Sequence, residues 1–179
     1  MNNVSKRTKD LTKMAILTAI SVVLVAICHF PVLPSLSFLE YDPADVPILL
    51  GTFAIGPAAG LIITTGVCLI QAFLLGGNGL YGALMHFIAT GTYVLAAGFY
   101  YKKHKTKKGA VTALVLGVIC WIAVMVIANI FITPVFMGAP RAAVISMLPG
   151  IALFNLIKSA VNSVITFLLY KRVSGVLHK

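Results

Sequence analysis

The chain has 179 residues, of which 60% are hydrophobic and only 10% are charged, and its mean hydropathy is +1.02. A water-soluble domain of this length does not need so apolar a composition for its core, so we expect an all-α integral membrane protein forming a single membrane domain over residues 1–179. The net charge of +10 comes mostly from three basic clusters that flank apolar segments, which is typical of cytoplasmic loops and argues against nucleic acid as a partner.

The first apolar segment spans residues 11–30 and follows a basic cluster at 6–13. About 20 apolar residues are needed to cross the hydrocarbon core of a bilayer, so this segment predicts a retained first membrane helix rather than a cleaved signal peptide. Within it, Ala15 and Ala19 have the small-xxx-small spacing that lets two helices approach closely. Their face is therefore a candidate contact with a partner protein.

The next segment, 31–45, contains Glu40, Asp42 and Asp45, which are three of the four acidic residues of the chain. Asp42 precedes a proline and Asp45 follows three residues later, a pattern that favours a helix N-terminus, where carboxylates cap free amides. We expect capping to be the main role of both aspartates. Tyr41 and Asp45 are also candidates for contact with a ligand.

The interval 43–75 is long for one membrane helix and short for two, and GPAAG occupies 56–60. If the N-terminal basic cluster and the lysine-rich segment 102–108 both face the cytoplasm, an even number of crossings must separate them. We therefore expect two helices, 43–57 and 58–75, which turn at Gly56 and Pro57.

Three further apolar segments complete a prediction of six transmembrane helices with both termini in the cytoplasm. They span 80–101, 110–132 and 149–170. The predicted outer segments, 31–45, 76–79 and 133–148, together contain one basic residue, Arg141.

A lysine, Lys158, interrupts the last apolar segment. The polar residues around it recur at i, i+3, i+4, i+7 and i+11 and therefore share one helix face: Asn155, Lys158, Ser159, Asn162 and Thr166. An intramembrane charge is costly and indicates a functional site unless it forms a structural ion pair. For Thr90, Ser159 and Thr166 the simpler interpretation is hydrogen bonding between helices.

Helix geometry places four of the polar residues in the outer half of the membrane, namely Lys158, Asn155, His86 and Asn129. This predicts a polar pocket that opens outward and is covered by the outer loops. The candidate substrate-binding residues are Lys158, Asn155, Asn129, His86, Tyr41, Asp45, Asn78, Tyr81, Tyr93, Trp121, Arg141 and Asn162.

Motifs for catalysis, metal binding or ATP binding are missing from the sequence. GxxxxGK[ST] and HExxH do not occur, the four histidines lack metal-ligand spacing, and the three cysteines stand alone in apolar segments. We therefore expect neither an enzyme nor a cofactor. A binding subunit that relies on partners for energy fits best, and a self-sufficient secondary transporter or channel is the alternative.

Four segments resemble the substrate-binding S components of energy-coupling factor (ECF) vitamin transporters, particularly the branch containing riboflavin and pantothenate carriers. They are YDPADVPILLGTFAIGPAAG at 41–60, GGNGLYGALMHFIATG at 76–91, NIFITPVFMGAPR at 129–141 and FNLIKS at 154–159. The resemblance implies a six-helix protein of the bacterial plasma membrane that captures a vitamin at the outer face. It also implies association with a transmembrane coupling protein, the T component, and with two cytoplasmic ATPases.

The resemblance also assigns roles to particular residues. In that family an AxxxA pattern on the first helix contacts the coupling protein, and here the pattern maps to Ala15 and Ala19. Asn155 and Lys158 match the family's Asn-x-x-Lys positions on the sixth helix. The family's ligand sites are built from the first outer loop and the outer halves of helices four to six.

Pantothenate is the ligand that the sequence favours. Lys158 and Arg141 could both bind its carboxylate, and the third helix reads VCLIQAF at 67–73 where riboflavin carriers usually have a Lys-Asn pair. The lysine of the sixth helix also occurs in riboflavin carriers, so riboflavin is the second candidate. A pyridoxine-like or pyrimidine ligand is the third.

Overall fold

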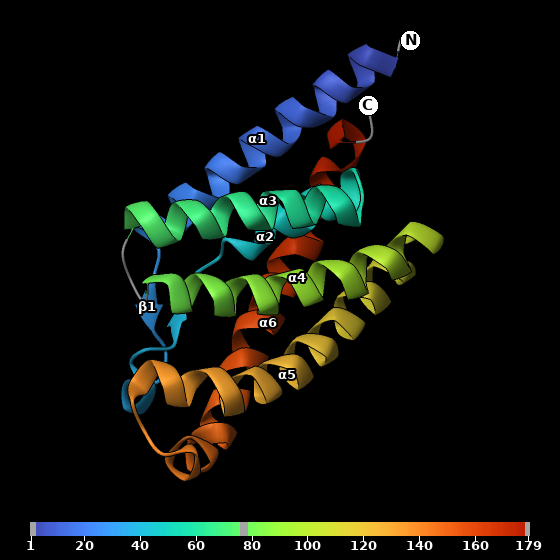
Figure 1. Ribbon diagram of the computed structural model, residues 1–179. Coiled ribbons are helices and arrows are strands. Elements are labelled where there is room, and N and C mark those ends of the chain that lie inside the picture. The colour runs from blue at the N-terminus through green and yellow to red at the C-terminus, as the bar shows by residue number, and fades with distance from the viewer. Residues whose placement is uncertain (1–2, 76–78, 178–179) are drawn as a thin grey trace.

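The computed structural model describes residues 3–75 and 79–177, and most of these residues lie in helices that pack side by side (Figure 1). The described α-helices are α1 (Asn3–Ile27), α2 (Asp45–Ala54), α3 (Pro57–Ile70), α4 (Gly79–Lys103), α5 (Lys107–Met137) and α6 (Arg141–Leu177). A π-helical turn, η2 (Gln71–Leu75), continues α3, and a 3-10 turn, η1 (Pro34–Leu36), lies between two short strands, β1 (Phe30–Pro31) and β2 (Glu40–Tyr41). The predicted all-α class is confirmed.

Five helices in the described part of the chain are long and apolar enough to cross a membrane, and they correspond to α1 and α3 to α6. Their large apolar side chains are exposed along most of their lengths, as expected for surfaces that face lipid. The remaining predicted span, 43–57, is the second in chain order. In the structure it is shortened to α2, whose 10 residues extend only about 15 Å. The predicted number of helices is thus found, but α2 is too short to cross alone.

Helix α2 is enclosed by other helices. Every residue from Asp45 to Phe53 is buried, and α1, α3, α4 and α6 pack around the helix. It ends at Ala54, just before the predicted turn, where Gly56 has a φ of 136°, a backbone conformation that side-chain-bearing residues rarely adopt. Pro57 then begins α3, where its missing N–H costs no hydrogen bond.

The last two helices extend well beyond their predicted bounds. Helix α5 continues through Pro134 to a left-handed Gly138, and α6 begins at Arg141 and contains Pro149 in its interior. Most of the predicted outer loop 133–148 is therefore helical. The predicted helices end at 132 and begin at 149, before Pro134 and at Pro149. Membrane helices tolerate proline in their interior because neighbouring groups and local adjustments compensate for the lost hydrogen bond.

The two ends of the bundle differ in composition. Helix α1 begins, α6 ends, and α4 joins α5 at the same end (Figure 1), and the lysines of segment 102–108 are exposed there. At the opposite end, β1 and β2 form an antiparallel hairpin in which Phe30 pairs with Tyr41. The α5–α6 connection lies at this hairpin end as well (Figure 1).

Candidate functional site

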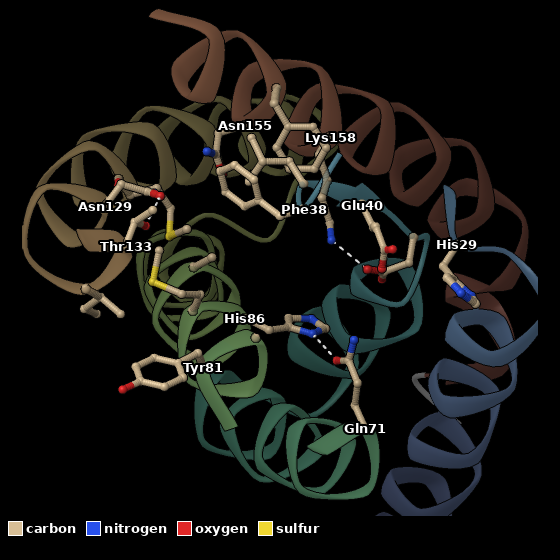
Figure 2. Close-up of a pocket in the computed structure, with 18 of the residues that line it drawn as sticks. His29, Phe38, Glu40, Gln71, Tyr81, His86, Asn129, Thr133, Asn155 and Lys158 are labelled. Carbon is tan, nitrogen blue, oxygen red and sulfur yellow. Dashed lines mark hydrogen bonds and ion pairs between the residues drawn. The ribbon is translucent and has the colours of Figure 1, made fainter. Parts of the chain in front are cut away.

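A cavity of about 250 Å³ lies at the hairpin end of the bundle. One part of its wall is apolar and includes Val25, Ala26, Phe38, Leu39, Met85, Ala89, Trp121, Met125, Ile132, Phe136 and Phe154. Another part carries polar groups from His29, Glu40, Asp42, Gln71, His86, Asn129, Thr133, Asn155 and Lys158. In Figure 2, Lys158 and Asn155 extend from α6 on one side, and His86 and Tyr81 extend from α4 on the other. An apolar cavity with a few converging polar groups is the usual form of a small-molecule site.

Lys158 forms a buried ion pair with the first outer segment. Its Nζ lies 2.7 Å from Asp42 Oδ2, and the two side chains are only 9% and 6% exposed. Asp42 Oδ1 also accepts a hydrogen bond of 3.1 Å from the backbone N–H of Ala44. Asp42 thus accepts a hydrogen bond from one backbone amide just before α2 and neutralises Lys158 at the same time, whereas α2 has no side-chain cap.

The other aspartate, Asp45, does not cap α2, so that prediction is wrong. Asp45 is the first residue of the helix, and Ala44 occupies the capping position. The buried Asp45 carboxylate instead accepts hydrogen bonds from Thr90 Oγ1 at 2.6 Å and from Asn162 Nδ2 at 2.8 Å. These donors on α4 and α6 lie inside the bundle, so the carboxylate links three helices just behind the cavity.

His86 connects this inner carboxylate to the cavity wall. Its Nδ1 lies 2.8 Å from Gln71 Oε1, and its Nε2 lies 3.4 Å from Asp45 Oδ1. Gln71 begins the π-helical turn η2, a local irregularity that is frequent at functional sites. The sequence analysis did not select Gln71, although an amide within the apolar stretch 67–73 was a usable signal.

A second layer of side chains holds the cavity residues in place. The Tyr41 hydroxyl donates a 2.9 Å hydrogen bond to Asn162 Oδ1. Burial, together with the nearby Asp42 carboxylate, raises the pKa of Tyr41, so this hydroxyl keeps the proton that it donates. Trp121 Nε1 donates to Asn155 Oδ1 at 2.6 Å, and the Tyr93 ring meets the Trp121 ring edge-on.

The candidate residues therefore fall into three groups. Those that line the cavity are Lys158, Asn155, Asn129, His86, Tyr81 and Trp121. Those behind the wall are Tyr41, Asp45, Tyr93 and Asn162. Arg141 is exposed outside the lining, with its guanidinium 5.1 Å from the centre of the Phe131 ring, and Asn78 lies outside the described residues.

Several lining residues were missed by the sequence analysis. Phe38, Phe154 and Met85 are ordinary apolar residues in apolar segments, so no pattern separates them from residues that face lipid. Glu40 was considered only as one of three loop acids. Among the described residues, no group of three His, Cys, Asp or Glu side chains could hold a metal ion.

Comparison with known proteins decides the family. The family model described as "ECF transporter, substrate-specific component" matches residues 9–170. The chain belongs to this family. The resemblance noted in the sequence is thereby confirmed, and this S component is a multi-pass protein of the bacterial plasma membrane. The family is described by a transport role rather than by catalysis.

Curated relatives of this S component are riboflavin transporters. The riboflavin transporter RibU of Staphylococcus aureus (strain TCH60) is 32% identical over 97% of this chain and 95% of its own length. The riboflavin transporter FmnP of Bacillus subtilis (strain 168) is 29% identical over 92% of this chain and 91% of its own.

Solved structures show the same fold. The S component of a bacterial ECF transporter superposes with a TM-score of 0.85 at 31% identity, covering 97% of this chain and 99% of that one. The S component for biotin from an ECF-type ABC transporter gives a TM-score of 0.64 at 22% identity, with 96% and 95% covered, and supports the fold alone.

The geometry of the site bears on pantothenate, the ligand preferred from the sequence. The earlier preference treated Lys158 and Arg141 as cations available to a carboxylate. In the structure Asp42 already neutralises Lys158, and Arg141 is outside the cavity lining. The physical basis for choosing an anionic vitamin is therefore lost.

Proposed function

We propose that this S component binds riboflavin in the cavity at the hairpin end and delivers it for ATP-driven uptake. The observation that carries the proposal is the 32% identity to a riboflavin transporter over nearly the whole chain, including the segments that build the cavity. The charge arrangement supports it, because Lys158, the one lysine among the described residues of the cavity lining, is paired with Asp42.

The chemistry of the wall suits riboflavin. Its flat tricyclic ring has two large apolar faces, which the aromatic and sulfur-containing side chains of Phe38, Trp121, Phe154, Met85 and Met125 can cover. The ring edge and the ribityl chain carry hydrogen-bonding groups but no net charge. The amides of Asn129 and Asn155 and the ammonium of Lys158 offer partners to such groups without requiring an anion.

The direction of uptake follows from the basic clusters. They flank the end of the bundle where α1 begins and α6 ends, and basic clusters next to membrane helices favour the cytoplasmic side. Both termini are thus assigned to the cytoplasm, and the cavity opens toward the outside.

Energy is assigned to partner proteins, a T component and two cytoplasmic ATPases. The sequence of this chain contains no phosphate-binding GxxxxGK[ST] motif. Ala15 and Ala19 are exposed on α1, where small side chains let another membrane helix approach closely. This face is the proposed contact with the T component.

Binding of riboflavin to the purified protein tests the proposal. Calorimetric titration should give a dissociation constant in the micromolar range or tighter, and pantothenate should not compete. Asn155→Leu should weaken binding by about tenfold or more, or about 1.4 kcal/mol, because it removes a polar group of the wall. Val164→Ala, on the exposed face of the same helix, is the matched control and should bind as the wild type does. Absence of riboflavin binding, or tight binding of pantothenate, would refute the assignment.

Reconstitution separates this function from that of a self-sufficient transporter. Proteoliposomes containing the chain alone should take up no riboflavin, and uptake should require the T component, the ATPases and ATP. Substantial uptake by the chain alone would instead support a secondary transporter.

A further inference from the structure

The acidic residues of this strongly basic chain are concentrated at the cavity. The chain has 14 lysines and arginines and only 4 acidic residues, of which Glu40, Asp42 and Asp45 lie at the cavity or directly behind it. Lys158 is the one lysine among the described lining residues, and no arginine lines the cavity. Two carboxylates and one ammonium therefore line the cavity, and a third carboxylate lies directly behind the wall.

The three carboxylates are not equally satisfied. Asp42 pairs with Lys158, and Asp45 accepts hydrogen bonds from Thr90 and Asn162. Glu40 lines the cavity and is half-buried, yet within the described part of the chain it has neither a hydrogen bond nor an ion pair through its side chain. Its negative charge is therefore uncompensated.

The backbone fixes the position of this charge. Glu40 lies in β2 and pairs with Pro31 across the hairpin, and two residues later Asp42 is tied to α6 through Lys158. Figure 2 shows Glu40 on the same side of the cavity as the Lys158 ammonium. A ligand that approaches Lys158 must therefore also approach Glu40.

An anionic ligand would meet repulsion here without a matching attraction. A phosphate monoester carries about −1.5 to −2 charges near neutral pH. Charges inside a partly enclosed cavity are screened less than charges in bulk water. The two histidines of the wall are engaged with other groups of the protein, since His29 Nδ1 lies 3.0 Å from the backbone oxygen of Val25 and His86 lies between Gln71 and Asp45.

We propose that Glu40 is a specificity-determining residue, a charge filter that makes the cavity select an uncharged vitamin over its phosphate ester or another anionic ligand. The inference rests on the proposed function for the identity of the vitamin. For riboflavin, the rejected ligand is riboflavin 5′-phosphate, which differs only by the added phosphate group. Selection against a charge by a placed like charge is a common route to specificity.

The test compares the dissociation constants of riboflavin and riboflavin 5′-phosphate for the purified full-length protein. Wild type should bind the phosphate ester about tenfold or more weakly than the free vitamin. In Glu40→Gln, which keeps the side-chain shape and removes the charge, the ratio of the two constants should fall by about tenfold, or about 1.4 kcal/mol. Glu40→Asp keeps the charge and is the matched control, so its ratio should stay within about threefold of the wild-type ratio.

Two results would overturn the filter. One is a ratio that does not change in Glu40→Gln, and the other is a wild type that binds the two flavins equally well. A fall in the affinity of Glu40→Gln for both flavins by the same factor leaves the ratio unchanged, and it would show that Glu40 is a hydrogen-bond acceptor for the vitamin instead.

Two further pairs of ligands keep the filter and the proposed function distinguishable. Pantothenate and its neutral alcohol analogue panthenol, and pyridoxal and its 5′-phosphate, are titrated in the same way. If riboflavin does not bind but a neutral member of another pair does, the proposed vitamin is wrong, and the same ratio in Glu40→Gln decides the filter. If no neutral member binds more tightly than its anionic partner, the filter is refuted.

Discussion

Lys158 can carry its charge deep in an apolar helix because Asp42 lies 2.7 Å from its ammonium. Moving either ion from water into the protein interior costs several kcal/mol, and the pair recovers much of this cost only while both members are present. The pair also joins α6 to the segment that leads into α2. A residue that lines the cavity therefore stabilises the fold as well.

Removal of one member of this pair should destabilise the protein. Lys158→Met leaves the Asp42 carboxylate buried without a counter-ion, so we expect the free energy of unfolding to fall by about 3 to 5 kcal/mol. Thermal or denaturant unfolding of the ligand-free protein in detergent measures the change. In Lys158→Met, riboflavin should also bind about tenfold or more weakly.

A double variant distinguishes the pair from two independent residues. Asp42→Asn combined with Lys158→Met removes both charges and should recover a large part of the lost stability. Strictly additive losses from the two substitutions would show that the ion pair does not stabilise the fold.

The packing between α4 and α5 depends on one small residue. A Cβ at Gly117 would lie 2.1 Å from Cδ2 of Tyr93, a ring that is fully buried against Trp121. Because the ring cannot move aside freely, Gly117→Ala should lower the free energy of unfolding by about 1 to 3 kcal/mol. Thermal unfolding in detergent with and without riboflavin measures this change. Displacement of the Trp121 ring from the cavity wall should also weaken the binding of riboflavin.

Gly91→Ala is the control for this prediction. A Cβ at Gly91 would lie 3.6 Å from Leu61 Cδ2, an ordinary contact, so this variant should be neutral or slightly more stable, since alanine favours helix. Equal destabilisation by the two substitutions would mean that loss of glycine, rather than the clash with Tyr93, is responsible.

The elements show what could be predicted from the sequence. The turn at Gly56 and Pro57 has a strong local signal, and the polar face of α6 follows from residue spacing alone. The partner of Lys158 could not be identified, because Asp42 is 116 residues away in sequence and only the packing of α2 against α6 brings the two together. The same applies to Arg141, whose place outside the cavity depends on how α6 begins.

At the scale of the whole molecule, the exposed surface of α1 should contribute to transport but not to binding. Ala15→Leu with Ala19→Leu fills the small-residue face, which lies apart from the cavity lining. We expect riboflavin to bind the double variant normally, whereas ATP-dependent uptake in the complete complex should fall severalfold. Ile16→Leu with Ile20→Leu changes exposed residues of the same helix without changing their size and is the control. Weakened binding by the alanine variant would argue against a docking face.

The short helix α2 has a consequence for how the chain enters the membrane during synthesis. A segment of 10 residues cannot be recognised as a span by itself, since about 20 apolar residues are required. The tight turn at Gly56 and Pro57 joins it directly to α3, which is long and apolar enough. We therefore expect the insertion machinery to handle α2 and α3 as one hairpin, so that the buried carboxylate of Asp45 enters the bilayer attached to its neighbour and not alone.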